Sequence, residues 1–371
     1  MNSELDRMLM ERAIEVGRSA RFWSAPNPAV GCVLAKGDTV IGTGFTQPAG
    51  RQHAEIMALA EASDPRGATA YVTLEPCSHV GKTGPCVDAL IQAGVSRVVT
   101  SLEDPNQAVS GRGIAALRAA GIAVDVGLLA DTVENDLAGF LQRMRRGWGR
   151  ITLKVAVSLD GRTAMASGES QWIAGEAAPR DVQVLRAEAD PIVTGVGTVL
   201  ADDCRLTLRS DELPLNDEEK ARALAHPPAR MVLDSGGRTP ERAALLSEPA
   251  ATIFVTPTAK QVNSWLATVV DADDEGRVCL QAWVKLLGER QHNEVLVEAG
   301  PKLAGALIAG GWVDRLVVYQ APKLLGQNAA PMAAFDIDVL SDAPGFQIRE
   351  VTRIGEDLRM IATRVPPADL Q

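Results

Sequence analysis

Three residues in the first part of the chain have side chains that bind transition metals: His53, Cys77 and Cys86. A neutral imidazole and two thiolates occupy three corners of a tetrahedron and leave the fourth open, as in a catalytic zinc site rather than a structural one. Glu55 follows His53 by two residues, where it can carry a proton to or from a metal-activated water. This set of residues predicts metal-assisted hydrolysis.

The order of these residues is typical of the zinc-dependent deaminases. In that class a His-x-Glu segment is followed by Pro-Cys, a spacer and a second Cys. The usual spacer has two residues, whereas eight residues separate Cys77 from Cys86 here. Two alternatives remain open. The thiols could be ordinary buried residues, and a closed structural zinc site could take His79 as its fourth ligand.

Length and composition predict a globular protein of two domains. The chain has 371 residues, of which 46% are hydrophobic and 23% are charged. Its net charge of -10 argues against non-specific binding to nucleic acid. The five cysteines, an odd number with two assigned to the metal, indicate a reducing compartment. With neither a signal peptide nor a membrane-spanning apolar run in the sequence, we expect a cytoplasmic protein.

Hydrophobic periodicity predicts alternating helices and strands in the first domain. The expected helices cover 4–20, the segment from His53 onward, 86–93, 111–120 and 131–144, and the expected strands cover 31–34, 40–45, 69–74, 95–101 and 122–126. This alternation implies a sheet with helices on both faces. We place the domain boundary in the basic segment at the end of the last helix, which gives domains of residues 1–147 and 150–371.

The second domain also reads as α/β. Strands are expected at 151–156, 192–195, 230–234, 252–256 and 294–298, a helix around 182–187, and a surface excursion at 210–228. After the last strand, Gly300 to Ala306 form a glycine turn and a helix start, where free N–H groups could bind a phosphate. The segment is not G-x-G-x-x-G and gives no Rossmann fingerprint, so a plain strand–helix turn is the alternative.

Further motifs extend over nearly the whole chain. They are Asn27–Gly31, His53–Glu55, Thr73–His79 and Pro85–Cys86 in the first domain, and Lys154–Ala164, Ser167–Trp172, Gly195–Thr198, Ala201–Asp203 and Val297–Pro301 in the second. Together they resemble the bifunctional deaminase–reductase family of riboflavin biosynthesis. The resemblance implies an α/β fold with an N-terminal, cytidine-deaminase-like three-layer domain and a C-terminal domain similar to dihydrofolate reductase.

The resemblance also implies two reactions on one small molecule. The first is zinc-dependent hydrolytic deamination of a diaminopyrimidinone that carries a ribosylamino phosphate, and the second is NADPH-dependent reduction of the ribosyl chain to ribityl. We expect one zinc ion per deaminase domain, NADPH or NADP in the second domain, and a phosphoribosyl pyrimidine as substrate. We also expect no nucleic-acid or membrane partner, and a homo-oligomer that is a dimer or a tetramer.

The family's functional residues transfer to matching positions of this chain. His53, Cys77 and Cys86 would hold zinc, and Glu55 would take a proton from the attacking water and return it to the leaving nitrogen. The residues implied to contact NADP are Ala156, Trp172, Thr198, Asp202, Ser235, Gly300, Pro301, Lys302, Leu303, Ala304, Gly305 and Ala306. Those implied to contact the substrate are Asn27, His79, Ser170, Arg186, Leu206, Arg209 and Glu298. Arginine suits this task because its guanidinium binds phosphate through two N–H groups.

Three positions depart from the family pattern: Met57, Gly84 and Cys204. None of them removes a zinc ligand or Glu55. Two other functions remain as alternatives, a nucleoside or nucleic-acid deaminase with a non-catalytic C-terminal domain and a non-enzymatic binding module with a structural zinc. A nucleic-acid deaminase would need a basic, aromatic-lined groove, which a net charge of -10 and 4% aromatic residues do not favour.

Overall fold

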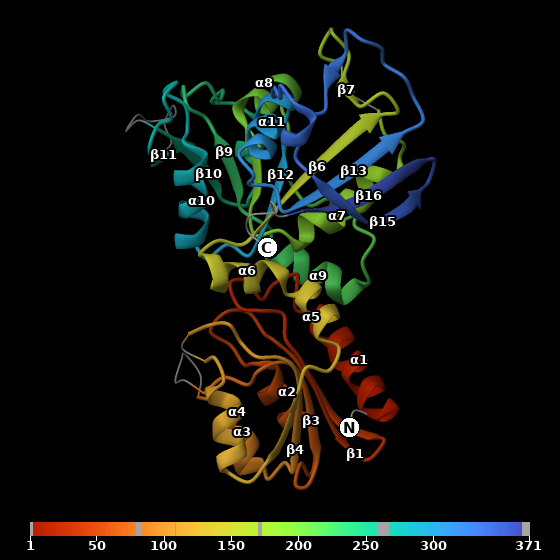
Figure 1. The fold of residues 1–371 in the computed structure, drawn as a ribbon, viewed down its shortest axis with the longest axis vertical. Helices are drawn as coiled ribbons and strands as arrows, with labels where there is room; N and C mark the ends of the chain where they lie inside the picture. Colours follow the sequence, from red (N-terminus) through yellow and green to blue (C-terminus); the bar gives the residue numbers. More distant parts are fainter. Residues whose placement is uncertain (1–2, 79–83, 108, 170–172, 258–266, 366–371) are drawn as a thin grey trace. The chain divides into compact units, whose positions relative to one another are not determined.

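The computed structural model describes residues 3–78, 84–107, 109–169, 173–257 and 267–365. The chain divides into two compact units, Met1–Gly149 and Arg150–Gln371. Each unit contains its own β-sheet with helices packed against it (Figure 1). The α/β class expected from the sequence is therefore confirmed.

The first unit is built on a five-stranded mixed sheet. Its strands are β1 (Gly31–Lys36), β2 (Thr39–Phe45), β3 (Thr69–Leu74), β4 (Arg97–Leu102) and β5 (Ala123–Val126), in the order β2-β1-β3-β4-β5. β1 is antiparallel to β2 and β3, whereas β3, β4 and β5 run parallel. The parallel strands end at the same edge of the sheet, and in open α/β sheets this carboxyl edge is where ligands bind.

Helices cover both faces of this sheet and make three layers. They are α1 (Glu4–Arg18), α2 (Ala54–Glu61), α3 (Cys86–Ala93), α4 (Arg112–Ala119), α5 (Ala130–Asp136) and α6 (Ala138–Arg146). α1 lies on one face, and α3 and α4 lie on the other (Figure 1). α2 packs closely on the hairpin, because a Cβ added at Gly44 would lie 2.2 Å from the carbonyl oxygen of Ala54. The glycine lets the helix backbone approach the strand.

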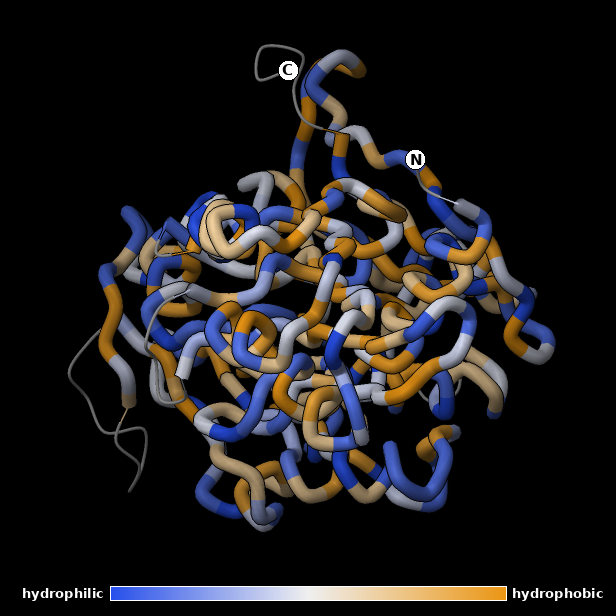
Figure 2. The backbone as a smooth tube through the Cα atoms, turned by 90° about the horizontal axis from the view of Figure 1, so that it is seen from below, coloured by the Kyte–Doolittle hydropathy of each residue, from blue (hydrophilic) through white to orange (hydrophobic). Residues whose placement is uncertain are grey.

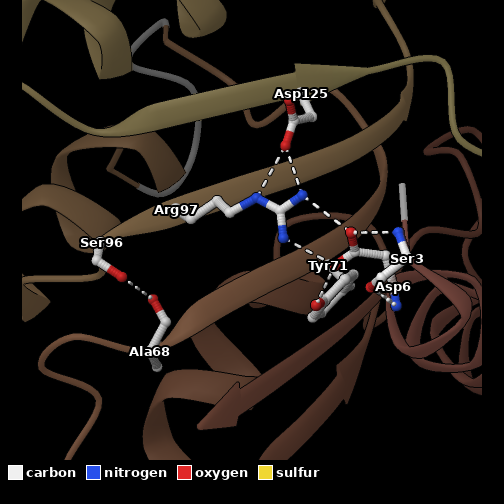
Figure 3. Close-up of polar contacts among 7 residues, drawn as sticks. All are labelled: Ser3, Asp6, Ala68, Tyr71, Ser96, Arg97 and Asp125. Carbon is white, nitrogen blue, oxygen red and sulfur yellow. Dashed lines mark hydrogen bonds and ion pairs between the residues drawn. The ribbon is translucent and has the colours of Figure 1, made fainter. Parts of the chain in front are cut away.

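A partly buried ion-pair network joins α1 to β3, β4 and β5 (Figure 3). Arg97 donates to both carboxylate oxygens of Asp6, at 2.7 and 3.0 Å, and also to Asp125. The Tyr71 hydroxyl donates to Asp6 at 2.7 Å. The Asp6 carboxylate also accepts the backbone N–H of Ser3, and the Ser3 hydroxyl accepts the N–H of Asp6, which completes a capping box at the start of α1.

The second unit contains a nine-stranded sheet in the order β11-β10-β9-β8-β12-β6-β13-β16-β15. The bounds are β6 (Arg150–Ser158), β8 (Ile192–Gly195), β9 (Arg230–Leu233), β10 (Thr252–Thr256), β11 (Ala267–Val269), β12 (Glu294–Glu298), β13 (Arg315–Ala321), β15 (Phe346–Ile354) and β16 (Asp357–Arg364). All neighbouring pairs are parallel except those that involve β16. β7 (Arg162–Ala164) and β14 (Ala330–Pro331) form a separate pair.

The helices of the second unit connect these strands. They are α7 (Ala177–Glu188), α8 (Val196–Asp202), α9 (Asp217–Ala225), α10 (Leu280–Glu289) and α11 (Pro301–Ala309), with short 3-10 turns at Ala244–Ser247 and Leu340–Asp342. Hydrophobic stretches along the chain are short and interrupted (Figure 2). Within the described ranges, no helix combines the length and the apolar character that a membrane span requires.

The fold differs from the sequence-based expectation in several places, which include elements that were not expected, such as α8 and α10. The single helix expected over 131–144 is two helices, since the buried Leu137 leaves the helical conformation at φ −102° and ψ 12°. The surface excursion contains α9, whose first turn is capped by the Asn216 side chain. The strands β13, β15 and β16 had not been expected at all.

Candidate active site

The three predicted metal ligands lie together at the carboxyl edge of the first sheet. The His53 Nδ1 atom is 3.5 Å from the Cys77 Sγ atom and 3.4 Å from the Cys86 Sγ atom. All three ligand atoms lie within 4.8 Å of one another. One imidazole and two thiols at this spacing fit three corners of a tetrahedral zinc ion, and no fourth His, Cys, Asp or Glu joins the group among the described residues. The donor set therefore fits the metal that the sequence predicts.

Each ligand is placed by the end of a secondary-structure element. Cys77 follows β3 after a short extended segment, His53 is the N-cap of α2, and Cys86 is the first residue of α3. The backbone N–H of Cys86 donates to the Cys77 Sγ atom at 3.4 Å, and that of Val87 donates to the Cys77 carbonyl at 3.2 Å. Helix N-termini favour anions, so this arrangement suits thiolate ligands.

The electrostatics of the cluster favour a thiolate at Cys77. Hydrogen bonding from Cys86 lowers the pKa of Cys77 to about 4, against the opposing effect of burial. The same interaction, together with burial, raises the pKa of Cys86. The hydrogen bond with Cys77 raises the pKa of His53. Metal ligands bind in their deprotonated form, so a thiolate at Cys77 is ready to bind a cation and the Cys86 thiol would lose its proton on metal binding.

Glu55 lies beside this cluster in the first turn of α2. The residue is only 4% exposed. Burial, reinforced by the neighbouring Cys77 charge, raises the pKa of Glu55 to about 7. A carboxyl group with a pKa near neutrality can both accept and return a proton, which is the property needed for general acid–base catalysis. The geometry is compatible with the role predicted for Glu55.

Of the two residues predicted to contact the pyrimidine, the structure describes Asn27 but not His79. Asn27 lies half-buried in the turn before β1, where its backbone N–H donates to the Ser24 carbonyl at 2.9 Å. His79 lies outside the described residues. Both assignments stay predictions.

In the second unit, the predicted phosphate-binding segment forms the N-terminus of α11. Gly300 is the N-cap, its N–H donates to the Thr198 hydroxyl at 3.2 Å, and no side chain caps the helix. Pro301 has no N–H, so Lys302 and Leu303 carry the remaining N–H groups of the first turn. The structure thus brings together Thr198 and Gly300, which are 102 residues apart in the sequence.

The other residues predicted to bind the cofactor have varied surroundings. Ala156 lies on β6, and Asp202 is exposed at the end of α8. The Ser235 hydroxyl accepts the Val278 N–H at 2.9 Å. Ala304 and Gly305 are buried in α11, whereas Ala306 is exposed, and Trp172 lies outside the described residues. A Cβ added at Gly305 would lie 2.0 Å from the Ala334 carbonyl oxygen, so packing requires this glycine whether or not a cofactor is bound.

A buried charge cluster contains two of the predicted substrate contacts. Arg186 donates to both carboxylate oxygens of Glu298, at 2.6 and 3.1 Å, and to the Thr207 carbonyl at 3.1 Å. Lys154 lies 3.3 Å from the same carboxylate. Burial raises the pKa of Glu298, but the charges of Arg186 and Lys154 outweigh this effect and lower it to about 2. Arg186 is thus already engaged with protein groups.

The loop after α8 carries the other predicted substrate contacts. Leu206 is buried with φ +52°, a left-handed conformation that is rare for leucine. The Arg209 N–H donates to the Gln183 Oε1 atom at 2.9 Å, while its side chain, 45% exposed, pairs with Glu212. Ser170 lies outside the described residues.

Lys154 and Gln183 were not among the site residues predicted from the sequence. Lys154 contacts Glu298, and Gln183 contacts Arg209. Lys154 lies within a strand and reaches Glu298 only through sheet pairing. Gln183 precedes Arg186 by three residues on α7, a spacing that places both on one helix face and could have suggested it.

Comparisons with known proteins find a match for each of the two units. The family model described as "RibD C-terminal domain" matches residues 150–360, and that described as "Cytidine and deoxycytidylate deaminase zinc-binding region" matches residues 3–102. The riboflavin biosynthesis protein RibD of Escherichia coli is 46% identical over 363 residues, which cover 95% of this chain and 98% of the relative. The RibD protein of Aquifex aeolicus is 35% identical over 366 residues, covering 96% and 98%.

Solved structures agree with the sequence relatives. An Acinetobacter baumannii RibD structure has a TM-score of 0.88 and 39% identity, and the match covers 98% of this chain and 99% of that one. A Thermotoga maritima protein described as a diaminohydroxyphosphoribosylaminopyrimidine deaminase and 5-amino-6-(5-phosphoribosylamino)uracil reductase has a TM-score of 0.84 and 29% identity, covering 97% and 99%. The chain belongs to the RibD family of bifunctional riboflavin-biosynthesis enzymes, with a zinc-binding deaminase domain followed by a reductase domain.

Proposed function

We propose that the first unit deaminates a phosphoribosylated diaminopyrimidinone and that the second unit reduces the ribosyl chain of the product with NADPH. The observation that carries the proposal is the cluster of His53, Cys77 and Cys86 beside the buried Glu55. The Thermotoga maritima relative is described with this pair of activities. The proposed assignment of activities to residues 1–147 and 150–371 follows the same resemblance.

In the deaminase unit, we assign one zinc ion per chain to His53, Cys77 and Cys86. When bound, zinc lowers the pKa of a water ligand and so supplies a nucleophile at neutral pH. Glu55 accepts the proton of the attacking water and returns it to the leaving nitrogen, a role for which a pKa of about 7 is suitable. Asn27 and His79 are proposed to hold the pyrimidine ring.

In the reductase unit, the N-terminus of α11 is proposed to bind a cofactor phosphate. The N–H groups of Lys302 and Leu303, together with the helix dipole, favour an anion there. NADPH, when bound, supplies the hydride that reduces the sugar. Among the residues that the resemblance assigns to the substrate, Arg209 is the arginine whose guanidinium is half exposed, so we assign the substrate phosphate to it.

The partners, the oligomeric state and the cellular location of the protein stay predictions. A small-molecule enzyme of this family needs no nucleic-acid partner, and the net charge of -10 is consistent with that expectation. We propose a homo-oligomer, a dimer or a tetramer, and a cytoplasmic location, for which the odd number of cysteines remains the argument.

The experiment that tests the proposal combines a Glu55→Gln variant with product analysis. The wild-type chain should release ammonia from the pyrimidine phosphate without NADPH and should form the ribityl product only when NADPH is added. Glu55→Gln should retain zinc by elemental analysis, but its deamination rate should fall by about 10²-fold or more, because an amide cannot carry the proton.

The variant's reduction of already deaminated substrate is the internal control and should be unchanged. Normal deamination by Glu55→Gln would disprove the role assigned to this residue. If the wild-type chain deaminates but neither binds nor oxidises NADPH, the reductase assignment is wrong and the second domain is non-catalytic.

A further inference from the structure

Glu75 is a buried carboxylate next to the metal cluster that has no part in the chemistry described above. It follows the last residue of β3 and precedes the Pro76–Cys77 pair. The residue is 4% exposed. A carboxylate at this depth requires hydrogen-bond donors, and the identity of its donors shows what it connects.

The Glu75 carboxylate accepts four backbone N–H groups. Its Oε1 atom accepts those of Gly113 at 2.8 Å and Ile114 at 3.1 Å, and its Oε2 atom accepts those of Gly111 at 2.9 Å and Asp104 at 3.1 Å. Three of these donors belong to the start of α4, whose N-cap Gly111 offers no side chain. Glu75 therefore caps a helix whose N-cap residue lies 36 residues later in the sequence.

The same helix start packs directly against the backbone that leads to the zinc ligand. A Cβ added at Gly113 would lie 2.2 Å from the Pro76 carbonyl oxygen. Pro76 restricts the conformation of the segment, and Cys77 in turn accepts the N–H groups of Cys86 and Val87. A continuous set of contacts thus runs from α4 through Glu75 to both cysteines.

We propose that Glu75 is a positioning residue for the deaminase site, which holds the Cys77 thiolate at its ligand position by fixing the Pro76–Cys77 segment to the N-terminus of α4. The inference rests on the proposed zinc-dependent deamination. It adds a residue that touches neither metal nor substrate. Partners of this kind, one step removed from the metal, typically change metal affinity or activity by about 10–100-fold when they are lost.

The decisive variant is Glu75→Gln. A carboxamide has one accepting oxygen, so in either orientation its NH₂ group faces two backbone donors that the carboxylate now accepts. We expect zinc to dissociate about 10–100-fold faster when a colorimetric chelator competes for it, and the kcat of deamination to fall by a similar factor. The KM for the pyrimidine phosphate should change little, and reduction of deaminated substrate should be normal.

The matched control is Glu103→Gln. Glu103 lies on the loop between β4 and α4, is exposed, and accepts the Ser110 hydroxyl at 3.2 Å. The Glu103→Gln substitution removes the same charge as Glu75→Gln but leaves the hydrogen bonds to the backbone of α4 in place. Zinc release and deamination by this variant should match those of the wild-type chain.

A second measurement does not depend on the variant folding. Because coupling between two sites is reciprocal, removing zinc from the wild-type chain should speed hydrogen exchange at the amides of Gly111, Gly113 and Ile114 but not at those of α1. The inference is wrong if Glu75→Gln is less stable to heat yet releases zinc and turns over at wild-type rates, or if zinc removal leaves these amides unchanged. A wild-type chain that binds no zinc would instead disprove the proposed function.

Discussion

At the scale of single residues, two arginines of the second unit differ in the exposure of their side chains. Arg186 neutralises Glu298 and holds the Thr207 carbonyl, and its side chain is only 14% exposed. Arg209 has its backbone fixed by Gln183 and a side chain that is 45% exposed. A buried ion pair that loses one partner leaves an uncompensated charge. Arg186 therefore supports the site, and Arg209 can exchange a surface ion pair for a ligand.

We expect Arg209→Ala to weaken substrate binding in the reductase step. Loss of one charge-assisted hydrogen bond should cost about 1.5–3 kcal/mol, which is roughly a 10- to 150-fold increase in KM. NADPH affinity, followed by fluorescence titration, should be nearly unchanged. The control is Arg205→Ala on the same loop, whose side chain is 64% exposed and pairs with Glu248. Equal effects of the two variants would show that Arg209 has no specific contact with substrate.

At the scale of elements, the start of α11 allows cofactor binding to be tested without disturbing the fold. A Cβ at Gly300 would have its nearest neighbour at 3.8 Å, the Thr198 hydroxyl, and the backbone has φ −72°, which alanine adopts readily. Gly300→Ala should therefore fold. Its methyl group would lie where a phosphate must approach the N–H groups, so NADPH affinity should fall at least about tenfold.

The control for this variant is Gly345→Ala. This exposed glycine also has its nearest neighbour at 3.8 Å from an added Cβ. By contrast, Gly305→Ala should destabilise the unit, because its Cβ would overlap the Ala334 backbone. Unchanged NADPH binding by Gly300→Ala would argue that the cofactor phosphate binds elsewhere.

The ion pair between Asp6 and Arg97 predicts that the stability of α1 depends on pH. The Arg97 hydrogen bonds, with those of Tyr71 and Ser3, lower the pKa of Asp6 below its ordinary value of 3.8. A lowered pKa stabilises the fold at pH values above the ordinary value, and this contribution is lost as the pH falls below it. Asp6→Asn should reduce the free energy of opening of α1 by about 1.5–3 kcal/mol near neutral pH, the cost of losing a hydrogen bond to a charged group. The difference should shrink below about pH 4.

Native-state hydrogen exchange of the α1 amides measures this free energy directly. Glu4→Gln in the same helix turn is the control, because Glu4 is exposed and should contribute only about 0.3–1 kcal/mol through the helix dipole. A deficit in Asp6→Asn that stays constant down to acid pH would contradict the electrostatic explanation.

Local sequence signals explain which parts of the fold and site could be predicted. The strand Thr69–Leu74 and the helix Cys86–Ala93 have the predicted bounds, since an apolar run and a Pro–Gly pair mark them. The break at Leu137 carries no proline, and the nearest glycine, Gly139, follows it inside α6, so no residue at the break itself marks it in the sequence. The α9 helix carried a recognisable start, Asn216 followed by three acidic residues, that was missed. Arg186 forms its ion pair with Glu298, which is 112 residues away, and no local sequence pattern predicts this contact.

At the scale of the whole molecule, each unit has its own sheet and, in the first unit, a large buried core that runs from Leu9 to Leu141. We expect fragments 1–147 and 150–371 to fold separately, the first to deaminate with zinc bound and the second to reduce deaminated substrate with NADPH. Circular dichroism and activity of each fragment measure this. If neither fragment folds, the boundary is misplaced or the two units depend on each other.

The position of β6 in the second sheet has a consequence for synthesis on the ribosome. β6 is the first strand of its unit to emerge, yet it lies in the interior between β12 and β13. Arg150 bonds Glu294 across 144 residues, and Thr152 bonds Arg315 across 163. Contacts this distant in sequence slow folding. The nascent chain must therefore carry β6 with both edges unpaired until β12 has been translated, and with one edge unpaired until β13 follows. A message truncated before Glu294 would yield a chain with its deaminase sheet complete and an aggregation-prone tail.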